Sequence, residues 1–209
     1  NLRFMPSLAY LRAAVAGDAI GAIHYVRAEV GQYLPDWRPG ADYRTGVSAR
    51  AELGGGVLLE LSHELDYLYW MFGMPDRVVC RGGRLSALEI DVEDVAELCL
   101  EYDQPARLVS VHLDFLRRPA ARRCELVGDM GTLTWDAIAD RIDRDGAPDA
   151  EAPAPMGDRN AMYTAELDAF LAAVDGTAPV PITLDDGIAV MRIVDAARRS
   201  LVSGRAEQP

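Results

Sequence analysis

The spacing of apolar residues near the start of the chain is helical. Apolar side chains recur three and four positions apart, at Leu8, Leu11, Ala14 and Val15. This spacing is typical of a helix that buries one face. Pro6 precedes them, and the first turn of a helix tolerates proline. We therefore predict a helix from Pro6 to Val15.

The spacing changes to a period of two in the second half of the chain, which is typical of strands with one buried face. The alternating set Ala96, Leu98, Leu100 and Tyr102 is followed by the set Val109, Val111, Leu113 and Phe115. The segment DQPA between the two sets predicts a hairpin turn. The segment RRCELVGDMGTLTWD predicts a further pair of strands that turns between Gly128 and Gly131.

The order of these elements defines a fold class. The predicted elements are a helix at 6–15, a strand at 23–30, a helix at 54–72, strands at 92–102, 107–116, 122–136 and 140–146, and helices at 160–174 and 184–202. Consecutive strands between helices favour an α+β fold, in which helices pack on one face of a largely antiparallel, open sheet. Thr183 and Asp186 are spaced to cap the last helix, and the tail from Gly204 is predicted to fray. A single domain, 1–209, accounts for the pattern.

Composition narrows the possible partners. The formal net charge is −12, and all 21 basic residues are arginine because the chain contains no lysine. Such a surface repels phosphate backbones and anionic lipids, so we expect neither nucleic acid nor membrane partners. No apolar run approaches the roughly 20 residues that span a bilayer, and no leader is visible, so a cytoplasmic location is expected. The start at Asn1, without methionine, predicts a segment from the middle of a longer protein.

The metal-binding and redox residue types are sparse. Cys80, Cys99 and Cys124 are widely spaced in strand-like segments, and we interpret them as reduced thiols. The three histidines, His24, His63 and His112, share no metal-ligand spacing. We therefore expect no metal site.

The segment GGGVLLELSHELDYLYW places one histidine among acids. In a continuous helix, Glu60, His63, Asp66 and Tyr67 would share one face. Carboxylates beside an imidazole can orient it and raise its basicity, so His63 is a candidate acid or base. The preceding glycines would let a ligand approach the positive end of the helix. A packed, non-catalytic histidine is the alternative interpretation.

The segment GQYLPDWRPGADYR gathers aromatic and charged side chains, with Tyr33, Trp37, Arg38 and Tyr43 as its candidate binding residues. Aromatic rings stack on the C–H faces of sugars, and charged groups bind hydroxyls. A loop whose aromatics only anchor it to the domain is an equal alternative. His112 and Asp114 point to the same side of one strand, where solvent or a second subunit would meet them.

Together these segments resemble the C-terminal domain of the Gfo/Idh/MocA family of NAD(P)-dependent oxidoreductases, which act mainly on sugars and polyols. The resemblance rests on NLRFMPSLAYLRAAV, GDAIGAIHYVRAEV, GGGVLLELSHELDYLYWMFG, EDVAELCLEY and VGDMGTLTWD. It covers nearly the whole chain, and the helix that carries His63 is its most specific part.

The resemblance implies a dehydrogenase C-terminal, GAPDH-like domain that binds substrate and forms a homodimer or homotetramer through its sheet. It implies His63 as the acid/base of hydride transfer, and a sugar or polyol bound by Tyr33, Trp37, Arg38, Tyr43 and Glu60. Glu60 lies three residues before His63, whereas the family's acid lies four before and is usually aspartate.

The cofactor is implied to bind elsewhere in the full-length protein. In the family, NAD or NADP binds to an N-terminal Rossmann domain that also supplies a lysine. This chain contains neither a GxGxxG fingerprint nor a lysine. The chain alone is therefore expected to bind no coenzyme and to be inactive.

Two other functions are also compatible with the sequence. One is a non-catalytic dimerisation or carbohydrate-binding module. The other is a metal-dependent sugar isomerase that uses His63, Glu60 and His112, although its ligands are sparse.

Overall fold

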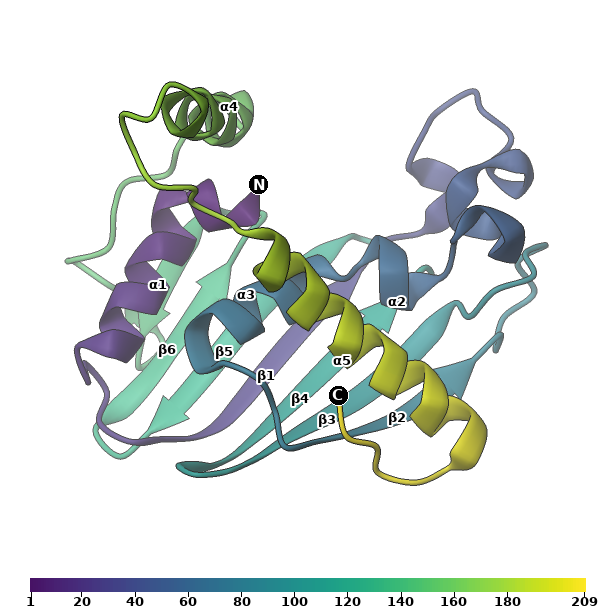
Figure 1. The fold of residues 1–209 in the computed structure, drawn as a ribbon, viewed down its shortest axis with the longest axis horizontal. Coiled ribbons are helices and arrows are strands. Elements are labelled where there is room, and N and C mark those ends of the chain that lie inside the picture. Colours follow the sequence, from purple (N-terminus) through teal and green to yellow (C-terminus); the bar gives the residue numbers. More distant parts are fainter.

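Helices cover one face of an eight-stranded open sheet, and the computed structural model describes all 209 residues (Figure 1). The strands are β1 (Ile23–Gly31), β2 (Arg77–Gly83), β3 (Val95–Asp103), β4 (Ala106–Asp114), β5 (Ala121–Gly128), β6 (Gly131–Asp136), β7 (Arg141–Arg144) and β8 (Ala147–Pro148). The α-helices are α1 (Pro6–Ala16), α2 (Val57–Glu60), α3 (His63–Phe72), α4 (Asn160–Val174) and α5 (Leu184–Ser203). Short 3₁₀ turns lie at Leu2–Phe4 and between β1 and α2.

The strand order is β2-β3-β4-β1-β5-β6-β7-β8. Only β1 and β4 run parallel, and every other neighbouring pair is antiparallel. The predicted α+β fold with a largely antiparallel open sheet is thus confirmed. Because β1 enters the middle of the sheet early in the chain, later strands build outward on both of its sides.

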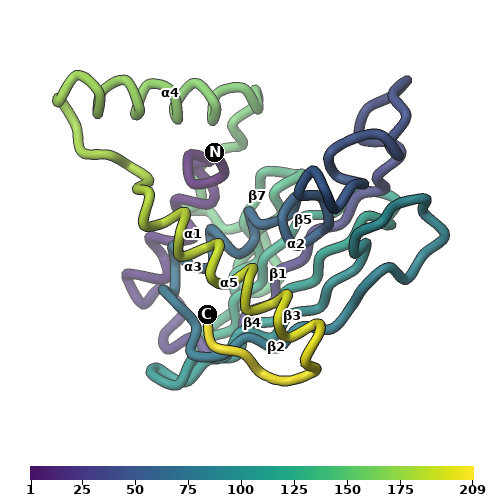
Figure 2. Tube along the Cα trace, turned by 45° about the vertical axis from the view of Figure 1, so that its right-hand side comes forward, coloured from purple at the N-terminus to yellow at the C-terminus, as the bar shows by residue number.

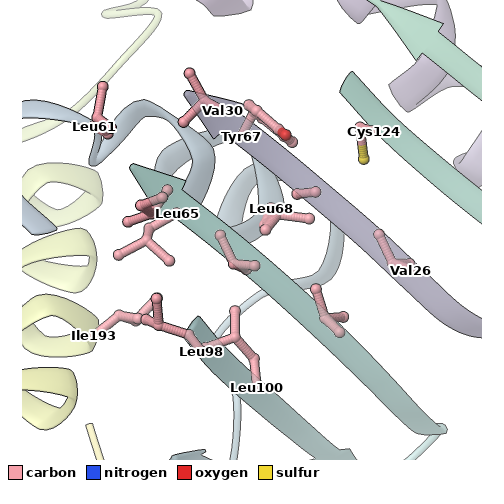
Figure 3. Packing of buried hydrophobic residues seen from close by; sticks show 14 of the residues in the cluster. Val26, Val30, Leu61, Leu65, Tyr67, Leu68, Leu98, Leu100, Cys124 and Ile193 are labelled. Atoms are coloured by element: carbon pink, nitrogen blue, oxygen red, sulfur yellow. The ribbon is translucent and has the colours of Figure 1, made fainter. Parts of the chain in front are cut away.

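The alternating positions of β3 and β4 face the helices. Leu98 pairs with Val111 and Leu100 with Val109, and all four side chains are buried. Figure 3 shows Leu98 and Leu100 beside Ile193 of α5 in the layer between sheet and helix. The period of two in the sequence therefore marked the buried face correctly, because successive side chains of a strand point to opposite faces.

The last helix crosses the sheet diagonally in Figure 1. Its buried positions follow a helical period: Ala189, Val190, Ile193, Val194, Ala196, Ala197 and Ser200. Thr183 and Asp186 form the predicted capping box at its start, which satisfies backbone N–H groups that a helix leaves unpaired. No helix of the protein is both long and apolar enough to cross a membrane.

The helix predicted at 54–72 is wrong in one respect, because the structure divides it. Gly56 has a φ of 101°, which glycine adopts readily, so α2 begins only at Val57. At Leu61 the backbone leaves the helical region, with φ −108° and ψ 22°, and α3 begins at His63. The break turns the Leu61 side chain into the core, where it is 5 % exposed.

The frayed C-terminal tail was also predicted wrongly. Glu207 pairs with Val78 at the edge of β2, through two backbone hydrogen bonds of 2.8 and 2.9 Å. Ser200 holds the turn between α5 and this bridge. Its buried hydroxyl accepts a hydrogen bond from the N–H of Cys80 and donates one to the carbonyl of Arg205. The tail is ordered because it completes the outer edge of the sheet.

A buried arginine ties the first turn to two helices. Arg3 is 7 % exposed and makes a two-bonded ion pair with Asp66 of α3, at 2.7 and 3.0 Å. It makes a third contact with Asp186 of α5 at 3.2 Å. Paired guanidinium groups of this kind can be buried because their donors stay satisfied.

Helix α4 lies apart from the sheet, above the start of the chain (Figure 2). Met162 is its only buried residue. Five apolar side chains, each 48–66 % exposed, form one stripe along it: Tyr163, Leu167, Phe170, Leu171 and Val174. Helix α4 therefore leaves an apolar face exposed along its length.

Candidate active site

Several segments meet around a cavity of about 430 Å³. They include the end of β1, the start of β5, the break between α2 and α3, and the first turn of α4. The break that interrupts the predicted helix therefore has a consequence for the site. It places Glu60 at the end of one short helix and His63 at the start of the next, and both side chains line the cavity.

His63 is open to the cavity and forms no hydrogen bond with another side chain. Partial loss of solvent around the ring and the nearby Arg122 guanidinium lower the pKa of His63 below its ordinary value of 6.5. Its position in the first turn of α3 acts in the same direction, because a helix N-terminus carries partial positive charge. The lowered pKa favours the neutral imidazole, the form that can accept a proton.

Neither predicted carboxylate is hydrogen-bonded to His63, and although the Asp66 charge raises the pKa of the ring, burial and Arg122 outweigh it. Glu60 accepts a hydrogen bond of 2.7 Å from the hydroxyl of Ser48. Asp66 forms an ion pair with Arg3. The break removes Glu60 from the predicted helical face, whereas His63 and Asp66 stay together in α3, where Arg3 pairs with Asp66.

Trp37 forms another wall of the same cavity. Its ring packs edge-on against Phe115, with 5.3 Å between centroids and an interplanar angle of 89°. Its indole N–H donates to the carbonyl of Gln32 at 3.1 Å. Trp37 and Glu60, two of the predicted substrate-binding residues, are thus held in place beside His63 by packing and hydrogen bonds.

The remaining predicted binding residues lie outside this cavity. Arg38 and Tyr43 line a second, smaller cavity of about 140 Å³, which Trp37 also lines. Tyr33 is half-buried, and the Arg118 guanidinium stacks on its ring, 3.3 Å from the centroid. The aromatic segment therefore serves two cavities that share the Trp37 wall, and Tyr33 acts as a support.

Three residues of the site were missed from the sequence: Arg122, Arg159 and Tyr163. Arg122 comes from β5, and its Nε lies 2.8 Å from Oε1 of Glu64. Glu64 is fully buried, and burial raises its pKa to about 7 despite the adjacent guanidinium. No local pattern marks these positions, because they join the site only through the pairing of β5 with β1 and the placement of α4.

His112 of β4 does not line this cavity. His112 lies between Glu97, at 2.5 Å, and Asp114, at 3.0 Å, on the face of the sheet opposite the helices. His63, Glu60 and His112 therefore do not come together as the ligands of an isomerase. No group of three or more histidine, cysteine or acidic side chains is placed to hold a metal ion.

The family of the chain follows from comparison with known proteins. The model of the GFO/IDH/MocA C-terminal domain matches residues 8–134. The chain belongs to this family of oxidoreductases. No curated protein sequence matches the chain.

Solved structures share the fold. GenD2 from gentamicin A biosynthesis, in complex with NAD, is 23% identical with a TM-score of 0.79, and the match covers 100% of this chain. The WlbA dehydrogenase from Bordetella pertussis, in complex with NADH and UDP-GlcNAcA, is 22% identical with a TM-score of 0.80 over 99% of this chain. A myo-inositol dehydrogenase from Corynebacterium glutamicum is 22% identical with a TM-score of 0.74 over 99% of this chain. This chain spans 62% of the length of each of these proteins.

Proposed function

We propose that this chain is the substrate-binding domain of an NAD(P)-dependent dehydrogenase that oxidises a hydroxyl of a sugar or polyol. The observation that carries the proposal is the cavity in which a neutral imidazole, a carboxylate and an indole ring converge: His63, Glu60 and Trp37. The similar structures agree with it, since they include complexes with NAD and NADH and an inositol dehydrogenase.

His63 is the acid/base in this proposal. When a bound hydroxyl is oxidised, the neutral imidazole accepts its proton as hydride leaves the same carbon. The nicotinamide coenzyme, when bound, supplies the hydride acceptor. A low pKa suits a base that must be unprotonated before it acts, and proton transfer of this kind typically contributes about 10²–10⁴-fold to rate. Glu60 accepts hydrogen bonds from substrate hydroxyls, and the Trp37 ring packs on the carbon face of the substrate.

The coenzyme is proposed to bind to a further domain of the complete enzyme, because this chain has no glycine-rich phosphate-binding loop. Helix α4 indicates where that domain would lie. The first turn of α4 lines the cavity, while the stripe from Tyr163 to Val174 is exposed beside it. A domain that brings the nicotinamide ring to His63 would therefore lie next to α4 and would cover the apolar stripe.

The test is coenzyme reduction by the complete enzyme. Neutral sugars, inositols, sugar acids and sugar phosphates are incubated with NAD⁺ or NADP⁺, and nicotinamide absorbance is followed. We expect at least one of these compounds to be oxidised with one coenzyme. If no compound is oxidised but a carbohydrate still binds to the protein, the result would instead support the non-catalytic module. The 140 Å³ cavity beside Trp37 is the one feature that favours that alternative, because His63 does not line it.

A further inference from the structure

The charges that line the His63 cavity are unusual for this protein. The chain as a whole carries a formal charge of −12, yet two arginines and only one carboxylate face the cavity. The arginines are Arg122 and Arg159, and the carboxylate is Glu60, which is hydrogen-bonded to Ser48. The lining is therefore positive inside a negative molecule.

Arg159 is the free cation of the pair. It is exposed, and its guanidinium makes no ion pair or hydrogen bond within the protein. The neighbouring Asp158 uses a carboxylate oxygen to accept the N–H of Asn160, the first residue of α4, at 2.9 Å. Arg159 directly precedes α4, so its side chain joins Met162 and Tyr163 on one wall of the cavity.

Arg122 adds positive charge deeper in the cavity. It is 18 % exposed, and its only partner is Glu64, which lies outside the cavity lining. Burial raises the pKa of Glu64 to about 7 despite this ion pair. The positive charge of Arg122 also acts on His63, whose pKa it helps to lower.

We propose that the substrate carries an anionic group, a carboxylate or a phosphate ester, which Arg159 binds at the open side of the cavity while Arg122 attracts it from within. The proposal rests on the function proposed above and specifies its substrate class. Guanidinium groups suit this role because their planar donors match the paired oxygens of both anions. An uncharged polyol would leave Arg159 without a partner and gain nothing from the field of Arg122.

The experiment measures kcat/KM of the complete enzyme for three matched compounds: an uncharged sugar, its sugar acid and its phosphate ester. Three proteins are compared: the unaltered enzyme, Arg159→Gln, and the control Arg192→Gln. Arg192 is an exposed, unpaired arginine on α5 that does not line the cavity. A hydrogen bond to a charged group contributes about 1.5–3 kcal/mol, and about 1.4 kcal/mol corresponds to a tenfold change.

We therefore expect the unaltered enzyme to prefer one of the anions over the uncharged sugar by about tenfold or more, and Arg159→Gln to reduce that preference at least about tenfold. Arg192→Gln should leave it unchanged. The anion that the enzyme prefers shows whether the anionic group of the substrate is a carboxylate or a phosphate ester. Oxidation of the uncharged sugar with equal or better efficiency, or an undiminished preference in Arg159→Gln, overturns the inference alone. Absence of any oxidation overturns the proposed function as well.

Discussion

Replacing His63 with asparagine should lower kcat of the complete enzyme at least about 100-fold, because the loss of a general base typically costs about 10²–10⁴-fold. Asparagine keeps a polar side chain of similar reach but cannot accept the proton. KM should change little, since the walls formed by Glu60 and Trp37 are held by Ser48 and Phe115 rather than by His63. Steady-state kinetics with the best substrate and coenzyme measure both constants.

The control for this variant is His24→Asn. His24 is an exposed histidine at the start of β1, hydrogen-bonded to Asp129, and it does not line the cavity. Its substitution should leave kcat unchanged. A His63→Asn enzyme that keeps a turnover similar to that of the His24→Asn enzyme would show that another group moves the proton.

Replacing Glu64 with glutamine should remove a large part of the pH dependence of stability. The carboxyl has a pKa of about 7 in the folded protein and an ordinary value of 4.5. The native state thus holds this proton more tightly than the unfolded state does. The unfolding free energy therefore falls as pH rises from 4.5 to about 7, and the full penalty applies above that range. A shift of this size corresponds to about 3 kcal/mol.

Urea unfolding at about pH 5 and about pH 8 measures this effect. At the lower pH, Glu64→Gln should be the more stable protein by less than about 1 kcal/mol, because only a small part of the pH-dependent loss has occurred there. At the higher pH, Glu64→Gln should be the more stable protein by about 3 kcal/mol. Glu151→Gln, which alters an exposed acid, should follow the unaltered protein. If the stability of the unaltered protein and that of Glu64→Gln depended on pH in the same way, the raised pKa of the Glu64 carboxyl would be contradicted.

Much of the fold was predictable because its signals are local. A strand exposes alternate residues to each face, so the sets around Leu98 and Val111 revealed both strands and their buried side. The capping residues Thr183 and Asp186 marked the start of the last helix. The break at Leu61 was not predictable from period alone, because the core decides where that side chain points.

The site was less predictable because long-range contacts build it. His63, Glu60 and Trp37 were recognised from their neighbours in sequence, and they do share a cavity. Arg122 and Arg159 join them only after β5 pairs with β1 and α4 is placed over the start of the chain. No residue pattern near either arginine indicates that it will face the same cavity.

The central claim is that a neutral His63 takes the proton of the substrate, and the pH dependence of kcat/KM for substrate oxidation tests it most directly. Protonation of His63 abolishes its action as a base, so kcat/KM should fall toward acid pH with a midpoint below the ordinary histidine value of 6.5. In His63→Asn this acid limb should disappear from the residual activity. An acid limb that persists with an unchanged midpoint in the variant would contradict the assignment.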